Sequence, residues 1–256
     1  MSYLETLTPA ENLMLRDNCG TKLRELLKAT LLDLLMKKVL VFHEVVKTPD
    51  KRGRPRKYKY VETGPRFADH LELDQRAHEE PFLAPYRGNK GVRYLFRNLV
   101  RIAFTRAANT RAYHGLILSE PRMMPVRRGG LLNFFGVSRL NGSGKVSREV
   151  LMAELVRAGS ELVPLLNAKD DRARQMLTRL NGNVLLLSGI DISMLPDMDI
   201  GDVDQPGKSD KGGTGCGGCS SFIGFDSGFD VGADAAGCGG EGGSGCGGSG
   251  CGGGCS

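Results

Sequence analysis

Tryptophan is absent from this chain, and aromatic residues of all kinds make up only 6% of it. A buried core therefore has to be built mainly on leucine, valine and alanine. Cysteine is almost as scarce where a fold is expected, because only Cys19 precedes residue 216 among the 7 cysteines. The expected folded part thus holds a single thiol.

Long apolar runs are missing too. The longest, residues 31–42, is interrupted by Asp33, Lys37 and Lys38, whereas a bilayer crossing needs about 20 consecutive apolar residues. Residues 1–20 lack the basic start and the apolar stretch of a signal peptide. We therefore expect a cytoplasmic protein, either free or peripheral on a membrane face.

Acidic residues are nearly absent from the middle of the chain. Between residues 81 and 147, Glu120 is the only acid against twelve bases, a net charge of +11. Such a segment favours an anionic partner, either an acidic lipid or a nucleic acid. A solvated basic surface that only keeps the protein soluble is the alternative. The bases are Arg87, Lys90, Arg93, Arg97, Arg101, Arg106, Arg111, Arg122, Arg127, Arg128, Arg139 and Lys145.

Two helices and a hairpin are predicted at the N-terminal end. Thr8 and Pro9 form a helix start, in which Thr8 caps, Pro9 loses no hydrogen bond and an acid three residues after Thr8 reaches back to the cap. Apolar residues then recur every three or four positions over 21–38, which is typical of a helix with one buried stripe. Residues 39–46 and 57–61 are predicted to be strands of a β-hairpin, because a Pro/Gly-rich tip separates them.

The rest of the folded part is predicted to be mostly helical. A long helix over 92–111 carries Arg93, Arg97 and Arg101 on one face, because these residues stand four apart. Beyond about residue 197, glycine, serine and acids cannot bury enough apolar surface to order the chain, so residues 197–256 are expected to be disordered. The other expected elements are a helix over 69–78, strands at 116–118 and 131–137, a helix capped by Ser147 and a final helix over 170–187.

Two short motifs invite a chemical interpretation that their surroundings do not support. Cys216 and Cys219 have zinc-like spacing, but the later cysteines are irregularly spaced and no histidine accompanies them. Residues 142–145 resemble a phosphate-binding loop, which needs Gly where Arg139 stands and Ser or Thr where Val146 stands. We therefore predict a loop and a helix start there, with no metal and no cofactor.

The four histidines are scattered along the chain and form no pattern with a nucleophile. His70 and His78 lie near acids in the sequence, which leaves a metal site open. Solvated loop residues are the favoured interpretation of both. No catalytic residue is assigned, and an enzyme is not expected.

The hairpin tip is the most strongly basic short segment. After two helices, a basic hairpin is typical of the wing of a winged-helix protein, which contacts DNA phosphates or enters a minor groove. Arg-Gly-Arg-Pro at 52–55 also resembles a minor-groove AT-hook. A membrane surface or another subunit is the alternative partner. The basic residues are Arg52, Arg54, Arg56, Lys57 and Lys59.

The order of these elements resembles a known family. Residues 7–15 and 31–40, followed by the basic hairpin, look like the opening of the Golgi phosphoprotein 3 (GPP34) family. Residues 96–101 are similar to its arginine-bearing helix, residues 114–117 to its turn after a helix, and residues 170–177 to the start of its closing helix. The resemblance covers about residues 1–190 by pattern.

The resemblance implies a mostly helical adaptor that docks on membranes, binds phosphatidylinositol 4-phosphate and self-associates through its hairpin. Arg97 and Arg101 match the headgroup arginines of the family, and Lys28 is a looser third contact. Eukaryotic members place a tryptophan beside the headgroup, whereas Asp17 or Asn18 falls near that place here. The Gly/Cys-rich tail resembles that of bacterial members.

Together these observations predict a mainly α protein. One helical domain spans residues 1–196, with a winged-helix-like start over 1–63 that includes the basic hairpin, and a disordered tail spans 197–256. The expected function is non-enzymatic binding of anionic lipid headgroups through Arg93, Arg97, Arg101 and Lys28. The alternative is nucleic-acid binding through the hairpin as a wing, and a homo-oligomer formed through the hairpin is a further expectation.

Overall fold

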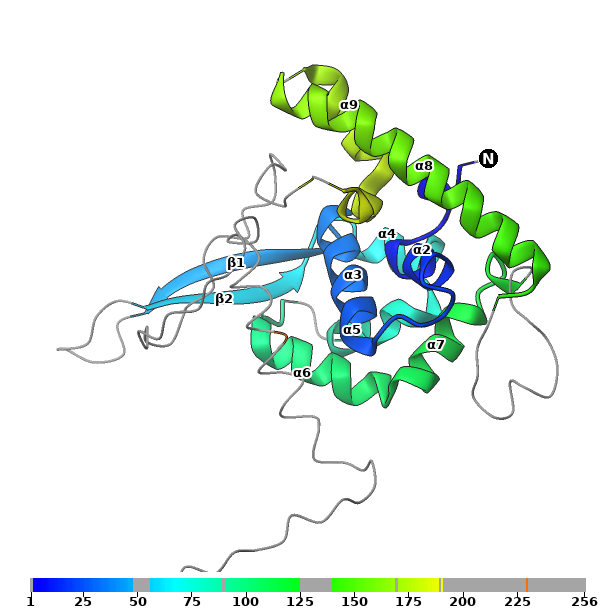
Figure 1. Cartoon of the computed structure of the whole chain (residues 1–256). Helices are drawn as coiled ribbons and strands as arrows, with labels where there is room; N and C mark the ends of the chain where they lie inside the picture. The colour runs from blue at the N-terminus through cyan, green and yellow to red at the C-terminus, as the bar shows by residue number, and fades with distance from the viewer. Residues whose placement is uncertain are drawn as a thin grey trace, which may run out of the picture.

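The computed structural model describes residues 2–47, 56–88, 91–124, 140–168, 170–188, 190 and 229. These residues form mostly helices together with one three-stranded antiparallel sheet, which confirms the predicted mainly α class (Figure 1). The tail predicted to be disordered lies outside the described residues, except for Phe229, which is buried. No helix in the described ranges combines the length and the apolar content that a bilayer crossing requires.

The N-terminal helices are α1 (Tyr3–Thr6), α2 (Pro9–Arg16) and α3 (Leu23–Met36). Thr8 caps α2 as predicted: its Oγ accepts a hydrogen bond from the Glu11 amide at 3.3 Å, and the Glu11 carboxylate accepts one from the Thr8 amide at 2.6 Å. Pro9 stands in the first turn, where a missing N–H costs nothing. Local side-chain chemistry therefore fixes where this helix begins.

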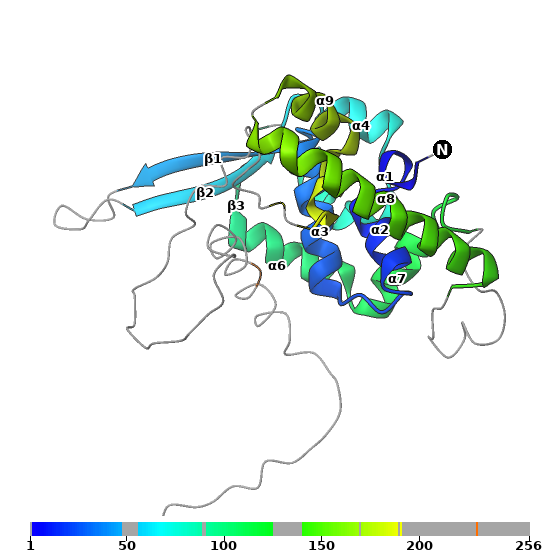
Figure 2. The ribbon, with the colours of Figure 1, turned by 45° about the horizontal axis from the view of Figure 1, so that its top comes forward.

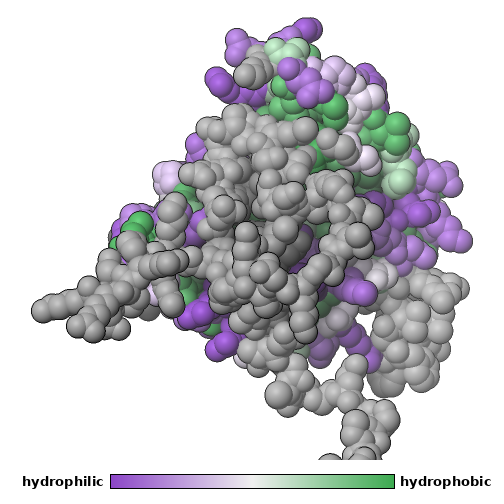
Figure 3. All heavy atoms as spheres, turned by 60° about the vertical axis from the view of Figure 1, so that its left-hand side comes forward, coloured by the Kyte–Doolittle hydropathy of each residue, from purple (hydrophilic) through white to green (hydrophobic). Residues whose placement is uncertain are grey.

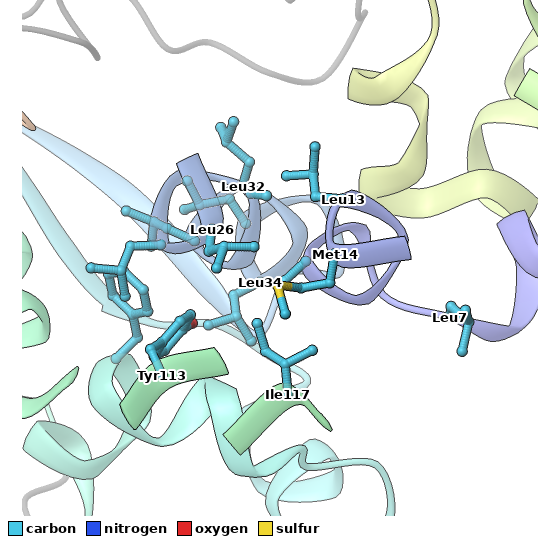
Figure 4. Packing of buried hydrophobic residues seen from close by; sticks show 14 of the residues in the cluster. Leu7, Leu13, Met14, Leu26, Leu32, Leu34, Tyr113 and Ile117 are labelled. Atoms are coloured by element: carbon cyan, nitrogen blue, oxygen red, sulfur yellow. The ribbon is translucent and has the colours of Figure 1, made fainter. Parts of the chain in front are cut away.

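Helix α3 lies at the centre of the hydrophobic core. Every residue from Ala29 to Leu35 is buried, so this part of α3 is covered on all sides and not only along the predicted stripe. Leu34 points towards Tyr113 and Ile117 of a neighbouring helix (Figure 4). The Tyr113 hydroxyl is also within 2.9 Å of the Thr30 Oγ. Because α3 contacts α2, β1 (Leu40–Lys47), η1 (Ala77–Glu79) and η5 (Asn181–Leu186) and bonds to Tyr113, it lies at the centre of the helical body.

The hairpin consists of β1 (Leu40–Lys47) and β2 (Arg56–Thr63), as predicted. The strands pair antiparallel with Leu40 opposite Thr63, and the two-residue strand β3 (Tyr94–Leu95) pairs with β2, giving the order β1-β2-β3. In two views the hairpin projects away from the helical body (Figures 1 and 2). Its tip, residues 48–55, lies outside the described residues.

Short elements connect the hairpin to the next long helix. The predicted helix over 69–78 is displaced, because its residues divide between two elements joined by a loop. The Tyr86 hydroxyl donates a hydrogen bond to the Val61 carbonyl at 2.9 Å, which fastens this segment to the sheet. The elements are α4 (Phe67–Leu73), η1 (Ala77–Glu79), α5 (Glu80–Leu83) and η2 (Ala84–Tyr86).

The single helix predicted over 92–111 is wrong. The chain forms β3 first, then α6 (Phe96–Ala107), and α7 (Thr110–Leu118) follows after a break. Ala108 has a φ of 62°, and the Asn109 side chain caps α7 by accepting from the Ala112 amide at 2.9 Å. A strand predicted at 116–118 is likewise wrong, since those residues end α7; the one predicted at 131–137 lies outside the described residues.

Two helices and a 3-10 segment complete the described fold: α8 (Gly142–Asn167), α9 (Asp171–Leu180) and η5 (Asn181–Leu186). The helix start predicted at 142–145 is confirmed, but Asn141 and not Ser147 caps α8. Ser147 instead accepts a hydrogen bond from the Tyr3 hydroxyl at 2.8 Å. The final helix predicted over 170–187 ends early, because the backbone turns at Asn181, whose φ is 46°.

A candidate anion-binding surface and a buried polar pocket

Helix α6 presents two exposed arginines on one side. Leu99, Val100 and Ala103 are buried, which turns the opposite side of the helix to solvent. Arg97 and Arg101 are exposed there, and their spacing of four residues places them on one stripe. Within the described residues neither side chain forms an ion pair. This is the part of the predicted headgroup site that the structure brings together.

The other two predicted headgroup residues lie apart from this stripe. Arg93 precedes α6 instead of standing on it, and its guanidinium pairs with the Glu62 carboxylate of β2. Lys28 is half-buried on α3 and already has an interaction partner. The prediction that Arg93 shares a helix face with Arg97 is therefore wrong, because the chain enters the sheet at Tyr94 before the helix begins.

The predicted basic hairpin is only partly described, and its described lysine is not exposed. Lys59 is buried, because it shares a strand face with the buried Val61, and its Nζ lies 5.7 Å from the centroid of the Phe42 ring. Arg52 and Arg54 lie outside the described residues, as do the side chains of Arg56 and Lys57. A basic residue that the sequence interpretation missed is exposed instead: the Lys47 ammonium donates to the Tyr60 hydroxyl at 2.9 Å.

Carboxylates from outside the basic segment neutralise part of its charge. Glu80 pairs with Arg87 at 2.6 Å, as Glu62 does with Arg93. Both acids precede the segment or stand at its border in the sequence, so a count of charges along the chain overstates the local positive potential. Lys90, Arg127, Arg128 and Arg139 lie outside the described residues.

The large apolar side chains that are exposed among the described residues all lie outside α6. Figure 3 shows an apolar area near the top of the hairpin side of the molecule. Hydrophilic residues border the described surface on both flanks of that view. Contact made through the α6 stripe is therefore expected to depend on charge.

A polar pocket of about 220 Å³ lies between α1, α3, α4 and η5, and the sequence interpretation did not find it. At its wall the Lys37 ammonium donates to the Asp33 carboxylate at 2.5 Å, and the Gly182 amide donates to the same side chain at 3.1 Å. An acid inside the leucine run of α3, with a lysine four residues later, was the available signal. The lining residues are Leu4, Glu5, Thr6, Leu7, Thr8, Asp33, Lys37, Arg66, His70, Asp74, Arg76, Arg122, Leu180, Asn181 and Asn183.

Histidines that were expected in solvated loops lie beside this pocket and are buried. The His70 Nε2 is 2.8 Å from a Glu79 carboxylate oxygen, and the His78 Nε2 is 3.2 Å from the Thr8 Oγ. The Tyr113 hydroxyl donates to the His78 carbonyl at 2.7 Å. The solvated-loop interpretation is therefore wrong, because both residues are buried, His70 beside Glu79 and His78 beside Thr8, which is distant in sequence. No cluster of metal-ligating side chains occurs within the described ranges.

Comparison of the chain with protein-family models, curated proteins and solved structures gives no match. The resemblance of residues 7–15, 31–40 and 170–177 to the Golgi phosphoprotein 3 family therefore stays a prediction.

Burial shifts the titration of several groups in and near the pocket. It lowers the pKa of His78 to about 4 and raises the pKa of Glu11 above its usual range. Burial also opposes ionisation of Glu79, but the hydrogen bond with His70 and nearby positive charge outweigh it and hold the pKa of Glu79 below its usual value. Burial raises the pKa of the Cys19 thiol to about 11, so this thiol is neutral and a poor nucleophile at physiological pH.

Proposed function

We propose that this protein is a non-enzymatic, cytoplasmic adaptor that docks peripherally on an anionic membrane surface through the α6 arginines. The observation that carries the proposal is the stripe of Arg97 and Arg101, which are exposed without an ion pair in the described part of the chain. Their neighbours Arg87 and Arg93 are both neutralised by carboxylates. Two uncompensated guanidinium groups on one rigid helix suit the phosphates of acidic lipid headgroups.

The expected strength follows from electrostatics. Each basic residue close to an acidic membrane contributes about 1 kcal/mol. Removing both charges of the stripe should therefore cost about 2 kcal/mol, or roughly 30-fold in apparent affinity. Other bases, among them Lys47, add to reversible docking.

The winged-helix alternative has less support. In such a protein the second helix exposes one face to the major groove, whereas α3 is buried on all sides from Ala29 to Leu35. The hairpin lysine Lys59 is buried as well. We therefore favour binding to an anionic membrane surface and treat nucleic-acid binding as an alternative outcome of the test.

The test is flotation with phosphatidylcholine vesicles that contain or lack phosphatidylserine or phosphatidylinositol 4-phosphate. Arg97→Gln/Arg101→Gln should bind acidic vesicles about 30-fold more weakly than wild type, and added salt should weaken both. Arg157→Gln/Arg172→Gln is the matched control: it removes the same charge from α8 and α9, where both arginines are ion-paired.

Equal weakening by the two double variants would mean that binding depends on net charge alone, and it would contradict the proposed role of Arg97 and Arg101. Unchanged binding by Arg97→Gln/Arg101→Gln would contradict that role as well. Tighter binding to an AT-rich DNA duplex than to vesicles, abolished by Arg54→Ala/Arg56→Ala, would favour the alternative.

A further inference from the structure

Phe229 is the one described residue beyond position 190, and its side chain is fully buried. Its ring meets Phe96 and Phe104 of α6 edge to face, with centroid separations of 6.2 Å in both cases. Phe96 in turn meets Phe42 of β1 edge to face at 5.6 Å. A single aromatic side chain from the C-terminal region thus occupies an aromatic notch, which we define by Phe42, Phe96 and Phe104.

The notch borders the arginine stripe. Phe104 follows Arg101 by three positions and Arg97 by seven, which is the spacing of neighbours along one side of an α-helix. Since Phe229 contacts both Phe96 and Phe104, it lies at the edge of the buried side of α6, next to the stripe of the two exposed arginines. An occupant of the notch and a membrane surface would therefore meet adjacent sides of α6.

The sequence around Phe229 matches the chemistry of this side. All phenylalanines of residues 197–256 fall at positions 222, 225 and 229, within an otherwise glycine-rich stretch. Asp226 and Asp230 flank Phe229. An aromatic group with acids close to it in the sequence suits an apolar notch beside two arginines, because the ring favours the apolar contact and carboxylates are attracted to nearby guanidinium groups.

We propose that the notch is a docking site for the segment of this chain around Phe229, and that the docked segment competes with anionic surfaces for α6. The second half of this proposal rests on the proposed function. Burying one phenyl ring shifts an equilibrium by about 10- to 100-fold. An acidic membrane that binds several basic residues can outcompete a contact of this size. Docking therefore sets a minimum density of negative charge on the membrane, below which the protein stays unbound.

The docking half is tested without any membrane. Because the chain has no tryptophan, Phe229→Trp in the full chain introduces a unique fluorophore. Its emission should be blue-shifted and protected from acrylamide, and an excess of a synthetic peptide of residues 222–231 should shift the emission to the red. The same peptide with Phe229→Ala should have no effect. A red-shifted, freely quenched tryptophan in a chain of unchanged circular dichroism would overturn docking.

The competition half uses phosphatidylcholine vesicles with phosphatidylserine. Phe229→Ala should bind them up to about 10- to 100-fold more tightly than wild type, and adding Arg97→Gln/Arg101→Gln should remove the gain. Wild-type affinity in Phe229→Ala, together with weakened binding in Arg97→Gln/Arg101→Gln, would overturn competition and leave the proposed function standing. No vesicle binding by any variant, with a protected indole in the Phe229→Trp chain, would overturn the proposed function and leave docking standing.

Discussion

Replacing His78 by glutamine tests how a buried histidine beside the polar pocket responds to acid. The imidazole is 1% exposed, and burial lowers its pKa from 6.5 to about 4. The unfolded chain therefore binds a proton in a pH range where the folded chain keeps this ring neutral. The contribution of His78 to stability is complete above pH 6.5 and is lost as the pH falls towards 4. In total the loss is about 3 kcal/mol, of which about 2 kcal/mol has occurred by about pH 5.

Urea unfolding followed by circular dichroism, at about pH 7.5 and about pH 5, measures this loss. Between the two pH values, His78→Gln should lose about 2 kcal/mol less than wild type, because glutamine does not titrate and keeps a polar group near the Thr8 hydroxyl. Glu79, with its lowered pKa, also loses stability in acid, whereas Glu11, with its raised pKa, gains it. Both carboxylates are present in the two proteins, so the comparison reports the imidazole together with its Coulombic coupling to Glu79.

His43→Gln is the matched control, because His43 stands on the hairpin with 40% of its side chain exposed. This variant should keep the wild-type difference between the two pH values. Equal losses in wild type and His78→Gln would refute the reasoning: the imidazole would then not be held neutral by its surroundings.

Three further predictions concern local structure. Gly115→Ala in α7 should raise the free energy of unfolding by about 0.5–1 kcal/mol, because a helical glycine is costly and a Cβ there meets nothing within 4 Å. Gly182→Ala should lower the free energy of unfolding by about 1–3 kcal/mol, because the added Cβ would lie 2.6 Å from the Asp33 Oδ1. Equal urea midpoints for the two glycine variants would contradict both predictions. Thr8→Ala should lower the free energy of unfolding by about 1 kcal/mol or more, because it removes the cap of α2. Thr8→Ser should keep the cap and a stability near that of wild type, and thermal unfolding measures both variants.

Features set by neighbouring residues could be predicted from the sequence. The start of α2 depends on Thr8 and Glu11, three residues apart, and the hairpin depends on two short runs around one tip. The break between α6 and α7 could not be predicted as easily, because the apolar spacing runs through it and Ala108 is an unusual residue for a positive φ. Its local signal is Asn109, which caps α7.

In the candidate site, too, some features follow from local spacing and others depend on contacts between distant residues. The spacing of Arg97 and Arg101 predicts a shared helix face, which requires only local geometry. The pairing of Arg93 with Glu62 depends on β3 joining β2, a contact between segments about thirty residues apart. The burial of His78 depends on Thr8 and Tyr113, which are still more distant in sequence. Such contacts follow from packing, which a pattern along the chain does not encode.

The strand order also places β1 at the border of the sheet, where no described strand pairs with its outer side. Main-chain groups along such a border can accept a strand from another molecule. Glu44 and Lys47 are exposed near the end of β1, and charged residues on an edge strand oppose indiscriminate pairing with other chains. The end of β1 therefore discourages edge-to-edge aggregation.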